Sequence, residues 1–157
     1  PTYDRRMKMD VVIQPESFNA GEELNKFTRK VRGAGAIVSF SGVVREIPGR
    51  LDSLNIEHYP GMAEKAINQI CKEAYKRWNL IDVLVIHRFG KLKKGELIMM
   101  VITASPVRID AFNSAEFLMD FLKSYAPFWK KEIGQNISSW VDAKDKDEKA
   151  LDRWDGA

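Results

Sequence analysis

Apolar residues recur along the chain with two different periods, which predict three helices and six strands within one domain. Spacings of three and four residues, which place side chains on one face of a helix, occur in three segments. Asn19 followed by Glu22 marks the start of the first helix, Gly33 its end, and Pro127 the end of the third. The expected apolar faces comprise Leu24, Phe27 and Val31; then Met62, Ala66, Ile67, Ile70, Ala74 and Trp78; and finally Ala111, Ala115, Leu118 and Leu122.

Short alternating or continuous apolar runs predict the strands. One of these strands should carry Val38, Phe40 and Val44 on one face, with Gly42 between them. Residues 89–95 are expected to form the turn of a hairpin between two strands. The order of elements predicts an α+β domain with a mostly antiparallel sheet. The expected strands are residues 9–14, 34–45, 54–59, 81–88, 96–104 and 135–141.

The composition is that of a globular protein. A chain of 157 residues, 45% hydrophobic and 30% charged, can bury a core without crosslinks and is not typical of disorder. Its single cysteine excludes an intrachain disulfide, a zinc ribbon and a CxxC redox site. The longest apolar run, residues 97–102, is far shorter than the ~20 residues that span a bilayer. The first residues lack the apolar core of a secretory signal, so we expect a cytoplasmic protein.

Basic residues outnumber acidic residues by 25 to 22, and the excess is unevenly spread. Residues 142–157 hold six acidic and four basic residues, which leaves a net charge of +5 on the rest. A body with this charge suits an anionic ligand but lacks the dense basic face typical of nucleic-acid binding. We assign residues 1–144 to a single domain and residues 145–157 to a charged, solvated C-terminal tail.

The cysteine and the two histidines are interpreted as structural. Cys71 lies on the apolar side of its expected helix, where it should be a buried small hydrophobe rather than a nucleophile. Any sulfur chemistry would therefore not use this thiol. His58 and His87 fall in expected strands, and neither has a second histidine or a carboxylate at the spacing of metal ligands. The sequence thus predicts no metal site.

A basic segment after the third expected helix holds the most informative candidate chemistry. Lys123 falls in the last helical turn, Pro127 forces the chain to turn, and Lys130 and Lys131 then return towards the same helix end. Ammonium groups that are close together and partly desolvated lose a proton more easily, so one of them can act as a base or nucleophile. The alternative is a solvated basic helix end, because a helix C-terminus favours a cation. Taken alone, the segment favours that alternative.

Two arginines stand where an anion can be bound. Arg45 ends an expected strand, and Arg108 lies at an expected helix start. A guanidinium beside a helix N-terminus suits a phosphate or carboxylate. Either arginine alone is more often a surface ion pair.

Five segments, in matching order and spacing, resemble the large, catalytic subunits of molybdopterin synthase. The resemblance covers about residues 9–144. Each pattern alone is weak, and the five together are specific. They are residues 35–45, GA followed by FxGxVR; 57–63, ExYxxMA; 87–96, HRxGxLxxGE; 108–132, RxxAF, DxLK and PxWKxE; and 140–144, WVxA followed by a basic residue.

The resemblance implies a fold and an activity. The fold would be an α/β-hammerhead-like domain with an additional, mostly antiparallel sheet region. The activity would convert cyclic pyranopterin monophosphate into molybdopterin by installing two sulfurs as a dithiolene. The sulfur would arrive as a thiocarboxylate on the C-terminal Gly-Gly of a small ubiquitin-like subunit, within a heterotetramer built on a homodimer of large subunits. The resemblance implies no cofactor, and no nucleic-acid or membrane partner.

The resemblance also transfers roles to single positions. Lys123 and Lys130 match the catalytic lysines, which would assist proton transfer and stabilise oxyanions. At Val107 the chain departs from the family, which usually has histidine there. The valine side chain can neither form a hydrogen bond to the substrate nor move a proton. The positions that match the substrate pocket are Arg45, Arg108, Lys131, Glu132 and Lys144, the last of which falls where a basic residue can reach the pocket across the dimer.

Two other functions stay open at this point. One is a non-catalytic subunit of the same architecture that docks a ubiquitin-like partner, favoured by Val107 and opposed by the presence of both Lys123 and Lys130. The other is a basic nucleic-acid-binding module, which would expose aromatic residues on a sheet. In this chain the aromatic residues fall among apolar residues at core spacings instead.

Overall fold

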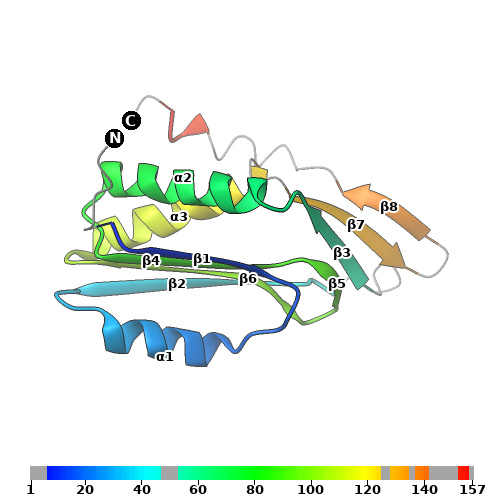
Figure 1. Ribbon diagram of the computed structural model, residues 1–157, viewed down its shortest axis with the longest axis horizontal. Coiled ribbons are helices and arrows are strands. Elements are labelled where there is room, and N and C mark those ends of the chain that lie inside the picture. The colour runs from blue at the N-terminus through cyan, green and yellow to red at the C-terminus, as the bar shows by residue number, and fades with distance from the viewer. Residues whose placement is uncertain (1–6, 47–52, 125–127, 135–136, 142–151, 156–157) are drawn as a thin grey trace.

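Two four-stranded sheets and three helices make up the part of the chain that the structure describes (Figure 1). The structure, a computed structural model, describes residues 7–46, 53–124, 128–134, 137–141 and 152–155. It confirms the α+β class and the positions of the three expected helices. In chain order the elements are β1 (Met9–Gln14), α1 (Ala20–Lys30), β2 (Ala36–Val43), β3 (Ser53–His58), α2 (Met62–Arg77), β4 (Asp82–Arg88), β5 (Gly90–Lys93), β6 (Leu97–Ser105), α3 (Arg108–Ser124), β7 (Phe128–Gly134) and β8 (Ile137–Val141).

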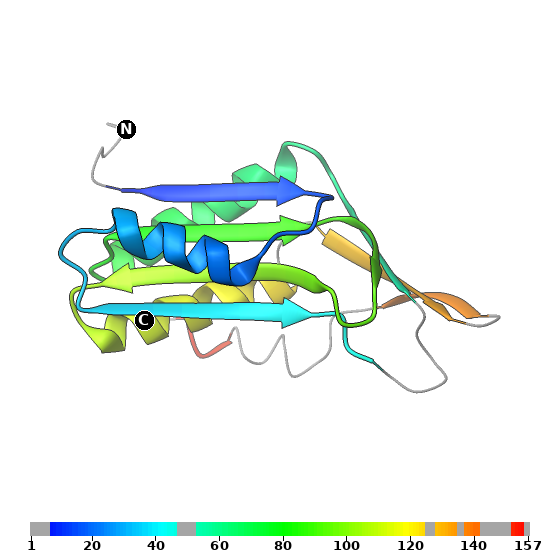
Figure 2. The same ribbon diagram turned by 90° about the horizontal axis from the view of Figure 1, so that it is seen from below.

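The first sheet has the strand order β1-β4-β6-β2 and lies between helices. β1 runs parallel to β4, whereas β6 pairs antiparallel with both β4 and β2. α1 covers one face of this sheet, and α2 and α3 cover the other (Figures 1 and 2). As expected, Asn19 caps α1 by accepting a hydrogen bond from the Glu22 backbone N–H. None of the helices in the described residues is long and apolar enough to cross a membrane.

Every residue of β4 is buried, because helices cover both faces of its sheet. Strand alternation sends Val83 and Val85 into the core beneath α2 and α3, and Leu84 and Ile86 into the core against α1. His87 continues the row of Val83 and Val85. It therefore reaches the α3 side of the sheet at the end of the strand.

A β-bulge ends the regular pairing of β2 and corrects the longer strand that the sequence predicts there. The pairing of β2 with β6 is regular as far as Gly42, and the register slips between Gly42 and Val43. The slip turns Val44 into the core beneath the second sheet, where its exposure is 2%. Phe40, on the first sheet, stays 42% exposed. Phe40 and Val44 therefore do not share a face.

The second sheet has the strand order β5-β3-β7-β8, is antiparallel throughout and extends beyond one end of the first (Figure 1). A small core that contains Leu54, Ile56 and Leu92 lies beneath it. β5 corrects the expectation of a simple hairpin turn at residues 89–95. β4 and β6 do pair antiparallel, but the connection between them adds a strand to the second sheet.

β7 is a strand that the sequence does not predict. Its residues, 128–134, alternate poorly between apolar and polar side chains, so the period of two is missing. Backbone pairing on both sides forms the strand instead, because β7 lies between β3 and β8. The expected strand at residues 135–141 corresponds to β8.

The buried guanidinium of Arg88 ties together the ends of three strands. Its Nε and Nη2 donate to the Pro15 carbonyl oxygen after β1, at 3.2 and 3.0 Å. Its Nη1 donates to Glu96 Oε2 at 3.0 Å and to the Leu97 carbonyl oxygen at 3.2 Å. The charge is buried with several acceptors, which is the condition under which such burial is tolerated.

Among the last described residues, 152–155, Trp154 packs against α2 and α3, whereas the other three residues are exposed, as expected of a solvated tail. The Trp154 ring meets the Trp78 and Phe117 rings edge-on, with centroid distances of 5.6 and 5.5 Å. Asp120 Oδ2 accepts hydrogen bonds from Trp154 Nε1 at 2.5 Å and from Arg153 Nη2 at 2.6 Å. An aromatic and a charged contact together therefore anchor the segment.

The Arg88–Glu96 pair predicts a pH dependence of stability. The hydrogen bond from Arg88 lowers the pKa of the Glu96 carboxyl below its usual 4.5. The pair should therefore stabilise the fold fully at pH values above the usual pKa of 4.5. Its contribution should be lost as the pH falls through the lowered pKa of the folded state. Urea unfolding of wild type and Glu96→Gln should show a difference in unfolding free energy at about pH 7 that shrinks towards about pH 3. An equal difference at both pH values would contradict this assignment.

Candidate functional site

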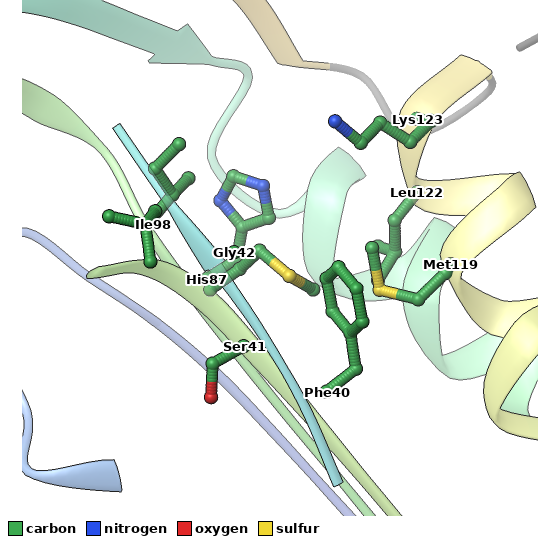
Figure 3. Close-up of a pocket in the computed structure, with 10 residues that line it drawn as sticks. Phe40, Ser41, Gly42, His87, Ile98, Met119, Leu122 and Lys123 are labelled. Carbon is green, nitrogen blue, oxygen red and sulfur yellow. The ribbon is translucent and has the colours of Figure 1, made fainter. Parts of the chain in front are cut away.

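A cavity of about 310 Å³ opens at the end of the first sheet, beside the last turns of α3 (Figure 3). Its walls come from the bulged end of β2, the end of β4, the start of β6 and the C-terminal part of α3. Most of the lining residues are apolar, while one histidine and one lysine supply nitrogen atoms. Apolar walls with a few placed polar groups are typical of small-molecule sites. The lining includes Phe40, Val43, His87, Met99, Met119 and Lys123.

Three local features place these side chains. The alternation of β4 carries His87 to the α3 side of the sheet. Gly42 leaves room for the side chain of Met99, since a Cβ at this position would lie 3.3 Å from Met99 Sδ. Lys123 follows Met119 by one helical turn, so both side chains reach the same cavity.

Lys123 occupies the position that the sequence predicts, in the last turn of α3. The side chain is exposed and its ammonium group points over the cavity (Figure 3). The carbonyl ends of the helix favour a cation at this place. Arg45 is also exposed and follows the lining residue Val43 by two positions. The structure thus brings one predicted lysine and one predicted arginine to the same end of the first sheet.

Lys130, Lys131 and Glu132 lie in β7, in the interior of the second sheet. Their backbones pair with Ile56, Asn55 and Leu54 of β3, respectively. β7 begins at Phe128, whose ring stacks on His87 with the centroids 3.9 Å apart. The start of β7 therefore adjoins the cavity that Lys123 lines. Lys144 lies outside the described residues.

Arg108 lies at the opposite end of α3 from Lys123. At the rise of an α-helix, their Cα atoms are about 22 Å apart. Arg108 instead borders a second hollow of about 470 Å³, together with Val107 and Gly35. A Cβ on Gly35 would overlap the Pro106 carbonyl oxygen, so this close approach requires glycine. Within one chain, Arg108 and Lys123 do not form a single anion pocket.

His87 lines the cavity although the sequence interpretation makes it structural. The signal that identifies it is the alternation of β4, which places it in the row of Val83 and Val85 beneath α3. His58 does not line this cavity; its ring packs on Phe89 at a centroid distance of 4.3 Å. Among the described residues there is no group of three or more histidine, cysteine or acidic side chains that can hold a metal ion.

Cys71 is fully buried in the core between the first sheet and α2, as expected. Burial raises the pKa of its thiol to about 12. The thiolate, which is the reactive form, is therefore strongly disfavoured near neutral pH. This confirms that the thiol is a packing group.

The chain matches one family and its solved structures over most of its length. A family model described as MoaE protein matches residues 13–125. The molybdopterin synthase catalytic subunit of Cereibacter sphaeroides is 56% identical over 146 residues, which cover 93% of this chain and 100% of the relative. The structure of the molybdopterin biosynthesis MoaE protein from Burkholderia ambifaria has a TM-score of 0.80 at 41% identity and covers 93% of this chain and 97% of that one. The crystal structure of molybdopterin synthase from Staphylococcus aureus has a TM-score of 0.72 at 29% identity, covering 88% and 98%.

The burial of Cys71 predicts that the native protein resists thiol reagents. At about pH 8 a thiol-specific disulfide reagent should leave the folded chain unmodified, because almost no thiolate is present or accessible. After denaturation in urea the same reagent should modify the thiol fully. Rapid, complete modification of the folded protein would show that Cys71 is accessible after all.

Proposed function

The chain belongs to the MoaE protein family, and on that basis we propose that it is the catalytic subunit of a molybdopterin synthase, a sulfurtransferase of molybdenum cofactor biosynthesis. The observation that carries the proposal is the placement of Lys123 over a mixed apolar and polar cavity of small-molecule size. The buried Cys71 is consistent with it, because the sulfur then has to come from another molecule.

In this proposal the sulfur comes from the thiocarboxylated C-terminal Gly-Gly of a small ubiquitin-like subunit, and the acceptor is cyclic pyranopterin monophosphate. An extended tail of two glycines carries no side chains, so it can approach a reacting atom through a narrow opening. In each sulfur transfer the thiocarboxylate sulfur forms a bond to a pterin carbon and displaces an oxygen substituent from it. Water then attacks the thiocarboxyl carbon, the bond between that carbon and the sulfur breaks, and the partner's tail leaves as a carboxylate. We place the reaction in the cytoplasm.

The side chains of the cavity suit separate roles in such a reaction. The Lys123 ammonium can stabilise the oxyanion that forms when the thiocarboxyl carbon is attacked, and can give or take a proton. Arg45, at the neighbouring end of β2, has the fork of donors that suits a phosphate. We assign Lys130 to the same centre as the second catalytic lysine, because β7 begins beside the cavity. Lys131, Glu132 and Lys144 are kept as proposed substrate-pocket residues.

Arg108 joins this site only if a second copy of the chain supplies it. One small anion cannot touch both ends of a helix about 22 Å long. A homodimer in which the start of one α3 faces the cavity of the partner would bring the two cations together. Exposed Val107, Ile109 and Phe112 surround Arg108, and such an apolar border is typical of a surface that another chain covers. We therefore propose a composite site within a homodimer.

Both lysines should be required for turnover. Reconstitution with the thiocarboxylated small subunit and cyclic pyranopterin monophosphate should form molybdopterin with wild type. Lys123→Ala and Lys130→Ala should each lose about 100-fold or more in rate. Lys72→Ala, which removes an exposed lysine of α2, serves as the matched control and should keep full activity. Full activity of both site variants would remove the catalytic assignment, and an inactive wild type would favour a non-catalytic binding subunit.

The composite site predicts complementation between two inactive variants. Lys123→Ala and Arg108→Ala should each be weakly active as homodimers. When they are unfolded together in equal amounts and refolded, half of the dimers combine one copy of each, and one of their two sites is intact. Activity should then recover to about a quarter of wild type. A mixture no more active than its components would contradict the composite site.

A further inference from the structure

One acidic side chain lies close to Lys123 on the same helix and has no role in the proposed reaction. Asp120 precedes Lys123 by three positions in α3. Side chains at this spacing are neighbours on a helix surface, and opposite charges there attract each other. The Lys123 ammonium nevertheless points over the cavity, and no ion pair joins it to Asp120 in the part of the chain that the structure describes. Other groups therefore occupy the carboxylate.

Three donors from the C-terminal segment, residues 152–155, converge on one oxygen of this carboxylate. Trp154 Nε1 donates to Asp120 Oδ2 at 2.5 Å, and Arg153 donates to it through Nη2 at 2.6 Å and Nε at 3.2 Å. These bonds turn the carboxylate towards the segment, and the guanidinium offsets its charge. Hydrogen bonds between ionised groups are among the stronger ones in proteins. The segment thus satisfies Asp120 in place of Lys123.

The indole ring that brings one of these donors is held by contacts of its own. The Trp154 ring meets the Trp78 and Phe117 rings edge-on, at centroid distances of 5.6 and 5.5 Å. The Trp154 carbonyl oxygen accepts a hydrogen bond of 2.8 Å from Arg77 Nη1 at the end of α2. The position of the indole nitrogen is therefore fixed by groups other than Asp120.

Loss of the three donors would change the surroundings of Lys123. Only 15% of the Asp120 side chain is exposed, so a carboxylate without its donors would be poorly solvated. Lys123 is the one basic residue of α3 besides Arg108 at its start, and its flexible stem lets the ammonium turn in more than one direction. An ammonium drawn back onto Asp120 would no longer extend over the cavity.

We propose that Arg153 and Trp154 are positioning residues, which occupy Asp120, prevent it from capturing Lys123, and so leave the Lys123 ammonium over the cavity. The inference rests on the proposed function for the reaction that Lys123 serves, whereas the placement of the ammonium is a property of this chain by itself. Neither Arg153 nor Trp154 lines the cavity. Their effect on turnover therefore passes through Asp120 and Lys123.

Three variants separate this role from simple support of the helix. Arg153→Ala combined with Trp154→Phe removes all three donors but keeps an aromatic ring, and is called the donor-free variant. Adding Asp120→Asn to it also removes the negative charge that would capture Lys123. The third variant is Asp120→Asn alone. Glu116→Gln is the matched control, because it removes the other ion pair of Arg153 with α3, 2.8 Å long, and leaves Asp120 occupied.

The placement of the ammonium is measured first, without turnover. The full chain, without the small subunit, is treated briefly with an amine-selective acylating reagent, and the modification of single lysines is followed by mass spectrometry. In the donor-free variant acylation of Lys123 should fall about threefold, the effect of an ion pair of ordinary strength. Adding Asp120→Asn should restore it. Lys72, an exposed lysine of α2, should react equally in every protein and serves as the internal reference.

Turnover should follow the same order. In the reconstituted reaction at saturating pterin, the donor-free variant should react about threefold more slowly than wild type, and the added Asp120→Asn should restore the rate. Asp120→Asn alone and Glu116→Gln should react like wild type. Thermal unfolding identifies the temperature at which all the proteins stay folded. If the donor-free variant does not fold, Arg153→Ala alone takes its place and should shift both measurements in the same direction.

A loss that Asp120→Asn does not relieve would overturn the proposal, since the segment would then act only by supporting α3. Unchanged acylation of Lys123 in the donor-free variant would overturn it as well, because Asp120 would then not reach the ammonium. Failure of the proposed function looks different. Wild type itself would then form no molybdopterin, while acylation of Lys123 would still follow the expected order.

Discussion

Burial of β4 on both faces is the constraint that orders this molecule. A strand without a solvated face needs a cover on each side, and here α1 supplies one and α2 with α3 the other. The alternation along the strand then decides what each cover meets. The odd positions from Val83 onwards face α3, and the last of them is a histidine rather than another apolar residue. The cavity thus begins where the packed row of the core ends.

A buried charged residue, Arg88, fixes the strand ends beside the last residue of that row. Arg88 follows His87 and bonds to groups at the ends of β1 and β6, which fixes the rim of the first sheet. From this rim the chain passes into β5 and so into the second sheet. The bulge at the end of β2 also links the two sheets, because it turns Val44 into the core of the second sheet. The cavity therefore lies where two sheets with separate cores meet.

Local patterns predicted the elements whose signals are local. The helical spacings placed α1, α2 and α3, and the run around Val85 placed β4, because burial in those segments follows directly from periodicity. β7 was missed, since it depends on pairing with strands far away in the chain. The same limit applies to the site. Lys123 could be found from its helix end, but the separation of Arg108 from it, and the approach of His87, depend on how elements pack.

The C-terminal anchor affects how the last turn of α3 moves. Helices fray from their ends, and Lys123 stands one residue from the end of this one. Asp120, one turn earlier, accepts hydrogen bonds from Arg153 and Trp154 of the docked segment. These contacts hold α3 one turn before the lysine that lies over the cavity. Residues near the end of the described chain therefore support the helix on which that lysine stands.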